Sequence, residues 1–282
     1  MKRKKNIVFA LVSAFCICSM GTSFSACKIG DFIKETYLLP EEFTMELSAD
    51  GSYYILIEAK DAVEMIIPQT HEGKPVKEIG ECAFLWCKSM ESVVIPEGIT
   101  TISHGAFMHS NLKSLALPDS LTTIGDSAFQ GCNNLTNLYI PDGVTSIEEK
   151  AFWGCENLRS VTIGDGVTSI EEKAFWECDN LRSVTIGDGV TSIGDYAFRD
   201  SVALSSVVIG RNVTSIGVCA FESRYHMLQS VVFLDTTTWY KTHFVEDFAA
   251  KENGEKTDVE NPAENAKLFN SEQRCYWYKL EK

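Results

Sequence analysis

Residues 151–173 read AFWGCENLRSVTIGDGVTSIEEK, and residues 174–196 read AFWECDNLRSVTIGDGVTSIGDY. The two segments are identical at 18 of 23 positions, so the chain contains a near-copy of itself. The Ala-Phe pair that opens each segment recurs every 22 or 23 residues, at 83–84, 106–107, 128–129, 151–152, 174–175, 197–198 and 220–221. A fixed period of this length predicts a solenoid, in which each small unit stacks on the next.

Each unit has the same internal pattern. A short run in which apolar and polar residues alternate is typical of a strand buried on one face. Pro or Gly ends the run, Asp-Gly marks a turn, a second extended piece reads Val-Thr-Ser-Ile, and a Gly-Asp N-cap precedes about one helical turn at Ala-Phe. The expected strand runs are 115–117, 138–140, 161–163, 184–186 and 207–209. The sequence therefore predicts an α/β fold with one strand and one short helical turn in every unit.

The repeats are expected to be flanked by caps, because a terminal unit has one face that no neighbour covers. Two β-rich runs flank Asp50-Gly51, a dipeptide favoured in hairpin turns, and a five-residue insertion lies between Pro68 and Ile79. The C-terminal aromatic residues are expected to cover the last repeat, and a carbohydrate platform is the alternative. The predicted organisation is a signal peptide at 1–26, an anchor and linker at 27–36, an N-terminal cap with a variant first repeat at 37–80, repeats of 22–23 residues at 81–234 and a C-terminal cap at 235–282.

The N-terminus has the pattern of an export signal. Basic residues at 2–5 precede the apolar run 7–18, which is too short to span a bilayer comfortably. The following Ser25-Ala26-Cys27 resembles a bacterial lipobox, although Phe24 stands where Leu is usual. We expect acylation of Cys27, which would hold the protein at the outer face of the membrane through several acyl chains. Ordinary signal-peptidase cleavage, which would give a secreted protein, is the alternative.

The charge of the chain narrows the classes of partner. The formal net charge is −14, and residues 27–282 carry −18 because the first 26 residues contain four basic residues and no acid. Such an acidic surface repels nucleic acid and anionic lipid. We therefore expect no nucleic-acid partner and no membrane contact except through the lipid anchor. We also expect a monomer without a cofactor.

Most of the ten cysteines lie outside the signal region. Six occupy positions fixed by the repeat: Cys82, Cys87, Cys132, Cys155, Cys178 and Cys219. Such positions are expected to hold buried thiols, although an exported protein would allow cysteines of adjacent units to oxidise. The short Cys-x-x-Cys pairs typical of zinc sites are missing from this set, so we expect no metal site.

Acidic residues also recur in columns. One turn carries Asp119, Asp142, Asp165 and Asp188 in successive units. An Asp in a turn usually hydrogen-bonds its own turn, and calcium ions shared between units are the alternative. The glutamate pairs at 148–149 and 171–172 are expected to be solvated helix starts rather than catalytic dyads.

Catalytic motifs are missing from the sequence. None of the five histidines lies in His-Glu-x-x-His, and neither Gly-x-Ser-x-Gly nor a phosphate-binding glycine-rich loop occurs. We therefore predict no catalytic residue and expect that the protein is not an enzyme.

The repeat can be written Leu-x-x-Val-x-Ile-(Pro/Gly)-x-x-Val-x-x-Ile-(Gly)-x-x-Ala-Phe-x-x-Cys-x-x over residues 81–234, with an entry repeat at Gly73-Lys74-Pro75-Val76. It resembles the BspA-like leucine-rich repeats of bacterial surface proteins. The resemblance implies a right-handed leucine-rich-repeat solenoid with a parallel strand ladder, short helical turns and β-rich caps. Members of this family are associated with adhesion to host matrix proteins, other bacteria or glycans. Because the motif consists of core positions, no binding residue carries over from the family.

The strand alternation leaves one candidate ligand-binding surface. Its members point away from the core or flank the strands: Asn137, Tyr139, Arg159, Thr162, Arg182 and Thr185. Arg and Tyr are common binding anchors, and the alternative is that the arginines only neutralise nearby acids. We expect a surface-attached binding protein that recognises an extracellular protein or glycan in adhesion or recognition. The alternatives are a structural spacer without a ligand and a carbohydrate-binding accessory lipoprotein, whose sign would be Trp153 and Trp176 exposed on one face.

Overall fold

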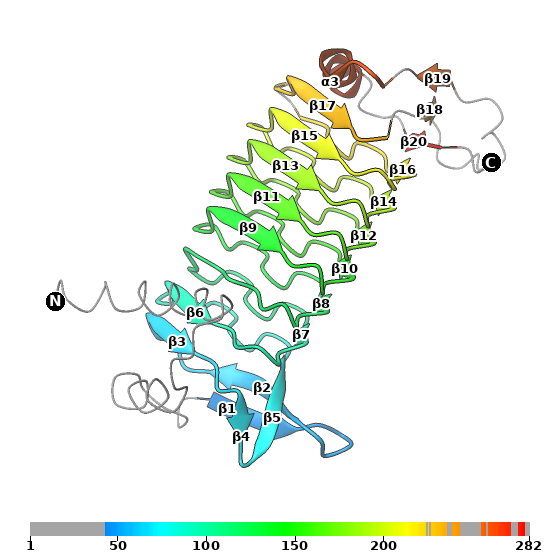
Figure 1. The fold of residues 1–282 in the computed structure, drawn as a ribbon. Coiled ribbons are helices and arrows are strands. Elements are labelled where there is room, and N and C mark those ends of the chain that lie inside the picture. The colour runs from blue at the N-terminus through cyan, green and yellow to red at the C-terminus, as the bar shows by residue number, and fades with distance from the viewer. Residues whose placement is uncertain are drawn as a thin grey trace, which may run out of the picture. The chain divides into compact units, whose positions relative to one another are not determined.

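The computed structural model describes residues 43–223, 225, 227–235, 239–242, 255–257, 259–271 and 276–279. Within this part, strands wind into stacked coils, and the one α-helix is α3 (Pro262–Ser271) (Figure 1). The chain is a parallel-strand solenoid with very little helix, so the predicted solenoid fold is confirmed.

Two sides of each coil are parallel strand ladders (Figure 1). The first side is a sheet of five in-register strands: β9 (Asn137–Ile140), β11 (Ser160–Ile163), β13 (Ser183–Ile186), β15 (Ser206–Ile209) and β17 (Ser230–Phe233). The second side consists of two-residue strands: β7 (Thr101–Ile102), β8 (Thr123–Ile124), β10 (Ser146–Ile147), β12 (Ser169–Ile170), β14 (Ser192–Ile193) and β16 (Ser215–Ile216). Both ladders follow from the repeat, because identical sequence offsets bring identical residues into register.

The third side of each coil begins at the Ala-Phe pair and is built from turns, where the sequence suggested one helical turn. Ala151 donates its N–H to Glu148 within the coil (3.2 Å), whereas Phe152 donates to Ala174 of the next coil (2.8 Å). The alternation needs left-handed backbone on either side of the pair, as at Lys150 (φ 56°) and Gly154 (φ 68°). Because every second N–H points to the next coil, this side is also a hydrogen-bonded ladder.

The core is organised around a column of phenylalanines. The rings of Phe84, Phe107, Phe129, Phe152, Phe175, Phe198 and Phe221 are buried, and their centroids lie 4.7–5.2 Å apart with interplanar angles of 1–5°. Around this column the Ile, Val and Leu of each coil are almost fully buried. The coils are therefore held at the separation of stacked rings, which is close to the strand spacing of about 4.8 Å.

The repeat cysteines beside the phenylalanine column are free thiols that satisfy backbone carbonyls. Cys132 Sγ donates to the Phe107 carbonyl (3.1 Å) and Cys155 Sγ to the Phe129 carbonyl (3.3 Å). Ser201 occupies the same column and donates from Oγ to the Phe175 carbonyl (3.3 Å). This equivalence explains why Cys and Ser alternate in the column. The six described cysteines form no disulfide.

The strand run expected at 115–117 is not a strand, and that prediction was wrong. Only Ser114 pairs, through a single bridge to Ser92, so the five-stranded sheet begins at β9. This unit has 22 residues, and the missing residue lies between Phe107 and Leu112, which are five positions apart instead of six. The shorter turn displaces the following run, and Leu115 and Leu117 pack against the core only partly buried.

The N-terminal end carries the hairpin expected at Asp50-Gly51. β1 (Phe43–Leu47) pairs antiparallel with β2 (Tyr54–Ala59), and β2 joins the second-side ladder through β5 (Lys74–Ile79). The five inserted residues form a small hairpin between β4 (Thr70–His71) and β5. A separate pair, β3 (Glu64–Ile66) with β6 (Ser92–Val94), lies on the first side.

The C-terminal end covers the last coil. α3 lies against β17, and its buried Asn265 donates to the carbonyl of Val231 (2.9 Å). Strand β20 (Tyr276–Tyr278) pairs antiparallel with β16 and with β18 (Trp239–Thr242), which also pairs with β19 (Glu255–Thr257). Trp239 and Trp277 are buried, so these aromatic rings cover the core and cannot form a carbohydrate platform.

Replacing Gly166 by alanine should destabilise the protein strongly. A Cβ at this position would lie 1.6 Å from the carbonyl oxygen of Asp142 in the preceding coil, so the coils would have to separate. We expect the free energy of unfolding to fall by roughly 3 kcal/mol, at the upper end of overpacking effects. Urea denaturation measures this change.

The control is Gly154→Ala. This glycine also has a positive φ, but a Cβ there would have no atom within 4 Å, and Glu177 occupies the equivalent position at φ 57°. Its expected cost is only about 1 kcal/mol, the ordinary penalty of a left-handed residue. Equal losses in the two variants would contradict the steric argument.

Candidate binding face

The candidate site is the outward face of the long strands, which we call the strand face. Alternation along β9 buries Leu138 and Ile140 and turns Asn137 and Tyr139 outward, and Tyr139 is 53% exposed. The six residues expected at this surface are all exposed: Asn137, Tyr139, Arg159, Thr162, Arg182 and Thr185. Parallel register aligns Thr162 with Tyr139 on one side and with Thr185 on the other.

Serines also belong to the strand face, and the sequence reasoning left them out. Ser160 and Ser183 stand one residue after the arginines, and Ser183 is exposed. Ser160 Oγ donates to Asn137 Oδ1 (2.7 Å) across the coils. The alternation that indicated Thr162 would also have indicated these two positions, because they lie two residues earlier on the same strands.

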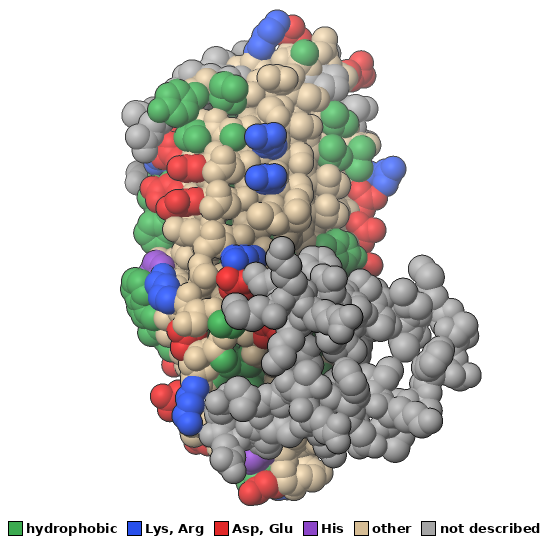
Figure 2. All heavy atoms as spheres, turned by 90° about the vertical axis from the view of Figure 1, so that its left-hand side faces the viewer, with side chains coloured by type: hydrophobic (Ala, Val, Ile, Leu, Met, Phe, Trp, Pro, Cys, Tyr) green, Lys and Arg blue, Asp and Glu red, His purple; other side chains and the backbone are tan. Residues whose placement is uncertain are grey.

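The two arginines lack acidic partners within the described ranges. Arg199, by contrast, has its Nε 2.9 Å from Glu222 Oε2 in an ion pair, and Arg211 pairs with Asp188. No ion pair joins Arg159 or Arg182 to a described carboxylate. Figure 2 shows two Lys or Arg side chains one above the other amid uncharged polar groups, with acidic side chains along both margins. The idea that these arginines only neutralise nearby acids therefore has no support in this part of the chain.

The aspartate column is occupied by hydrogen bonds between coils. Asp142 Oδ1 accepts the N–H of Asp165 (2.9 Å), and Asp165 Oδ1 accepts the N–H of Asp188 (2.8 Å). Asp188 in turn accepts the N–H of Arg211 (2.9 Å), which lowers the pKa of the Asp188 carboxyl. The expectation that each Asp bonds its own turn was wrong, because the stacked turn of the next coil presents a closer donor.

The tryptophans expected to mark a glycan platform lie on the third side of the coils. Trp153 and Trp176 are half-buried and stack on each other, with centroids 5.3 Å apart and an interplanar angle of 11°. Trp153 Nε1 donates to Glu177 (3.0 Å), and the cationic groups of Lys173 and Arg199 lie 5.6 and 5.9 Å from the centroid of the Trp176 ring. Since stacking uses the ring faces, this cluster does not form an exposed row of aromatic faces for sugar rings.

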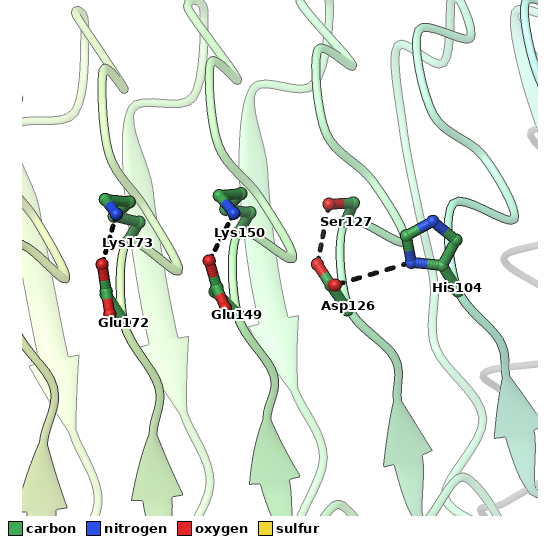
Figure 3. Close-up of polar contacts among 7 residues, drawn as sticks. All are labelled: His104, Asp126, Ser127, Glu149, Lys150, Glu172 and Lys173. Carbon is green, nitrogen blue, oxygen red and sulfur yellow. Dashed lines mark hydrogen bonds and ion pairs between the residues drawn. The ribbon is translucent and has the colours of Figure 1, made fainter.

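A further polar column lies on the third side (Figure 3). Ser127 Oγ donates to Asp126 Oδ1 (2.8 Å), and His104 Nδ1 lies 3.6 Å from Asp126 Oδ2. In a nucleophilic triad the serine would bond the histidine, whereas here both residues contact the aspartate. The next coils replace the pair by Glu149-Lys150 and Glu172-Lys173, each an ion pair between neighbours. This column therefore has a structural explanation.

Burial makes the repeat thiols unreactive. It raises the pKa of Cys87 to about 11 and that of Cys132 to about 12, and it raises the pKa of Cys155 and Cys178 well above the usual range. Thiolates are the nucleophiles and metal ligands. The described residues also contain no group of three or more His, Cys, Asp or Glu placed to hold a metal ion.

The predicted signal peptide and the lipidation site Cys27 lie outside the described residues. No helix in the described part has the length and apolar character needed to cross a membrane.

The stacked coils and their open strand face define a solenoid of the leucine-rich-repeat class. The family model described as BspA type Leucine rich repeat region matches residues 64–149 and 122–247, with six copies. The chain belongs to this family, which confirms the resemblance seen in the sequence.

Solved structures show the same fold. A leucine-rich repeat protein from Eubacterium ventriosum is 28% identical over 64% of this chain and 49% of its own, with a TM-score of 0.55, so the match spans about half of that chain. The T. pallidum leucine rich repeat protein is 24% identical over 68% of this chain and 91% of its own, with a TM-score of 0.48. A leucine rich cell surface protein from Faecalibacterium prausnitzii is 18% identical over 70% of this chain and 94% of its own, with a TM-score of 0.30. A comparison with curated proteins gives no match.

The buried thiols should resist alkylation in the native protein. At pH 8 we expect iodoacetamide to leave Cys132, Cys155 and Cys178 unmodified, because they are neutral and inaccessible. In 6–8 M urea, roughly the range that unfolds small proteins, the same residues should react fully. Peptide mass spectrometry reads each site separately, and native labelling of Cys155 at the rate of a free thiol would contradict this assignment.

His109 should make the stability of the first coils depend on pH. Its ring stacks on Trp86 (4.4 Å between centroids), and burial followed by the nearby charge of Lys88 lowers its pKa below 6.5. The unfolded chain therefore takes up this proton first as the pH falls. The free energy of unfolding should be complete above pH 6.5 and decline below it, and this component of the decline should disappear in His109→Gln.

Two measurements check the cause. Urea titrations between about pH 7.5 and 5.5 bracket the ordinary histidine pKa, and NMR gives the pKa of His109 directly. Lys88→Gln should raise that pKa, because the variant removes the nearby positive charge. A His109 pKa above 6.5 in the folded protein would contradict the prediction.

Proposed function

We propose that this protein is a surface-attached recognition module that binds an extracellular protein or glycan through its strand face. The observation that carries the proposal is the pair of exposed arginines, Arg159 and Arg182, which lack a carboxylate partner in the described residues of a strongly acidic chain. Exposed Tyr139 lies on the same sheet. Arg and Tyr in one patch are typical of binding surfaces.

Membership of the BspA-type family supports a binding or scaffold role at a bacterial surface. The F. prausnitzii structure is itself described as a cell surface protein. Acylation of Cys27 would supply the attachment, with the solenoid presented outside the membrane. Adhesion is one use of such a module, since a tethered binding protein joins its cell to whatever it binds.

A spacer without a ligand is the second candidate. Several polar columns are used between coils, as where Thr145 and Thr168 donate their hydroxyls to the Thr122 and Thr145 carbonyls. Such columns stiffen a solenoid without any ligand. The spacer role predicts that the strand face can be altered with no loss beyond stability.

A binding screen with a strand-face variant separates these two roles. The full chain, purified in mild detergent, is tested against host matrix proteins and glycans beside a Tyr139→Ala/Arg159→Ala/Arg182→Ala variant. We expect at least one ligand whose affinity falls about tenfold or more in the variant, since anchor residues carry most binding energy. Circular dichroism and urea titration establish that the variant is folded.

The control alters the same number of residues elsewhere, as Tyr225→Ala/Lys88→Ala/Lys267→Ala, all at exposed positions. It should bind like the wild type. Equal losses in both variants, or a folded protein that binds nothing in the screen, would favour the spacer.

Attachment through Cys27 is tested by cell fractionation. The wild type should remain with membranes and incorporate labelled palmitate, whereas Cys27→Ser should do neither because it lacks the acceptor thiol. Phe24→Leu restores the usual lipobox residue and should increase the labelled fraction. Membrane retention and labelling that persist in Cys27→Ser would overturn the anchor.

A further inference from the structure

We infer that the strand face binds an acidic glycan, a chain of sugar units carrying carboxylate groups, which lies along the solenoid axis across Arg159 and Arg182. The inference rests on the proposed binding function and names the class of its ligand. It follows from how the two arginines are placed, from what surrounds them and from the interval at which they repeat.

The arginines occupy one position in two adjoining coils. Arg182 donates its N–H to the Arg159 carbonyl (2.9 Å), and Arg159 donates to the Thr136 carbonyl (2.7 Å), so their backbones are fixed by the ladder. The Phe152 and Phe175 rings of the same coils lie 5.1 Å apart. The two guanidinium groups are thus offered on rigid strands at an interval of one coil.

Their chemistry favours carboxylates. A guanidinium is a planar fork of N–H donors that matches a carboxylate with two parallel hydrogen bonds. Other charged columns of the chain are already used, as Asp142 and Asp165 are by backbone N–H groups. Arg159 and Arg182 have no described carboxylate partner, so their charge is available to a ligand.

The surroundings favour a sugar chain over a protein. The positions that follow the arginines on the strands are hydroxyl residues, Ser160 with Thr162 and Ser183 with Thr185. Protein interfaces usually centre on an apolar or aromatic core, and within these three coils only Tyr139 is an exposed aromatic residue on the strand face. Hydroxyl groups at regular intervals suit the hydroxyl and ring oxygens of a glycan.

The interval points in the same direction. An extended acidic peptide turns every second side chain to the same face, at about 6.6 Å, which does not match the coil separation of 5.1 Å seen at Phe152 and Phe175. In a polyuronate every ring carries a carboxylate, and one pyranose unit advances by close to one coil. A carboxylate could therefore meet each arginine in turn.

The test uses polygalacturonate oligomers as the probe. Isothermal titration compares the full chain, purified in mild detergent, with Arg159→Gln/Arg182→Gln and with Lys88→Gln/Lys267→Gln, a control of equal net charge at exposed positions. We expect the arginine variant to lose about tenfold or more in affinity and the control to change less than about twofold, because charge-assisted pairs depend on position. Arg159→Lys/Arg182→Lys keeps the charge but should still lose much of the affinity, because lysine cannot form the planar pair.

Three further probes decide the ligand class. Fully methyl-esterified polygalacturonate has the same backbone without charge and should not bind. Dextran sulfate carries a different acid on a sugar chain and should bind more weakly, and poly-glutamate should bind weakest because its spacing differs. Equal loss in the lysine control, binding of the neutral ester, or preference for poly-glutamate or dextran sulfate would overturn the inference.

The outcome is separable from that of the proposed function. If no polyanion binds while the screen yields a neutral glycan or a protein whose binding needs Tyr139, the recognition role stands and the acidic-glycan assignment falls. If a folded protein binds neither the polyanions nor any ligand in the screen, both fall together.

Discussion

The stack of phenylalanine rings sets the interval to which every other column in the molecule conforms. Ring centroids 5.1 Å apart in the central coils nearly equal the separation of hydrogen-bonded strands. Ring stacking and backbone pairing therefore reinforce each other, and neither has to be strained to satisfy the other. Once the coils are held at this interval, any residue that repeats must tolerate a copy of itself at the same distance on each side.

That constraint sorts the columns by their chemistry. Apolar rings gain from a neighbouring copy, and hydroxyl or thiol columns gain because each member donates to a carbonyl of a preceding coil. Like charges lose, so they need compensation. Asp142 and Asp165 receive backbone N–H groups from the next coil, and Glu149 and Glu172 each pair with the following lysine. Arg159 and Arg182 repeat without such compensation from described residues, which is unusual for a position that costs repulsion.

Much of the fold could be predicted from the period, because a repeat of fixed length determines register, burial and the ladders together. The prediction failed at 115–117, where one missing residue breaks the register, and at the third side, where nothing in Lys150 signals a left-handed backbone. The alternation also gave the outward positions of the strand face. Whether Arg159 has a partner could not be predicted, since that depends on where the acids of neighbouring coils point.

The location of the free arginines is a consequence of how each side uses its polar groups. On the third side, alternate N–H groups bond the next coil, and Trp153 and Trp176 spend their ring faces on each other. The Asp-Gly turns are so closely stacked that Gly166 has no room for a Cβ, and their carboxylates already hold the next coil. On the long strands, pairing satisfies the backbone alone and leaves the outward side chains unconstrained. The strand face is thus the side on which sequence can vary for recognition at the least cost to the stack.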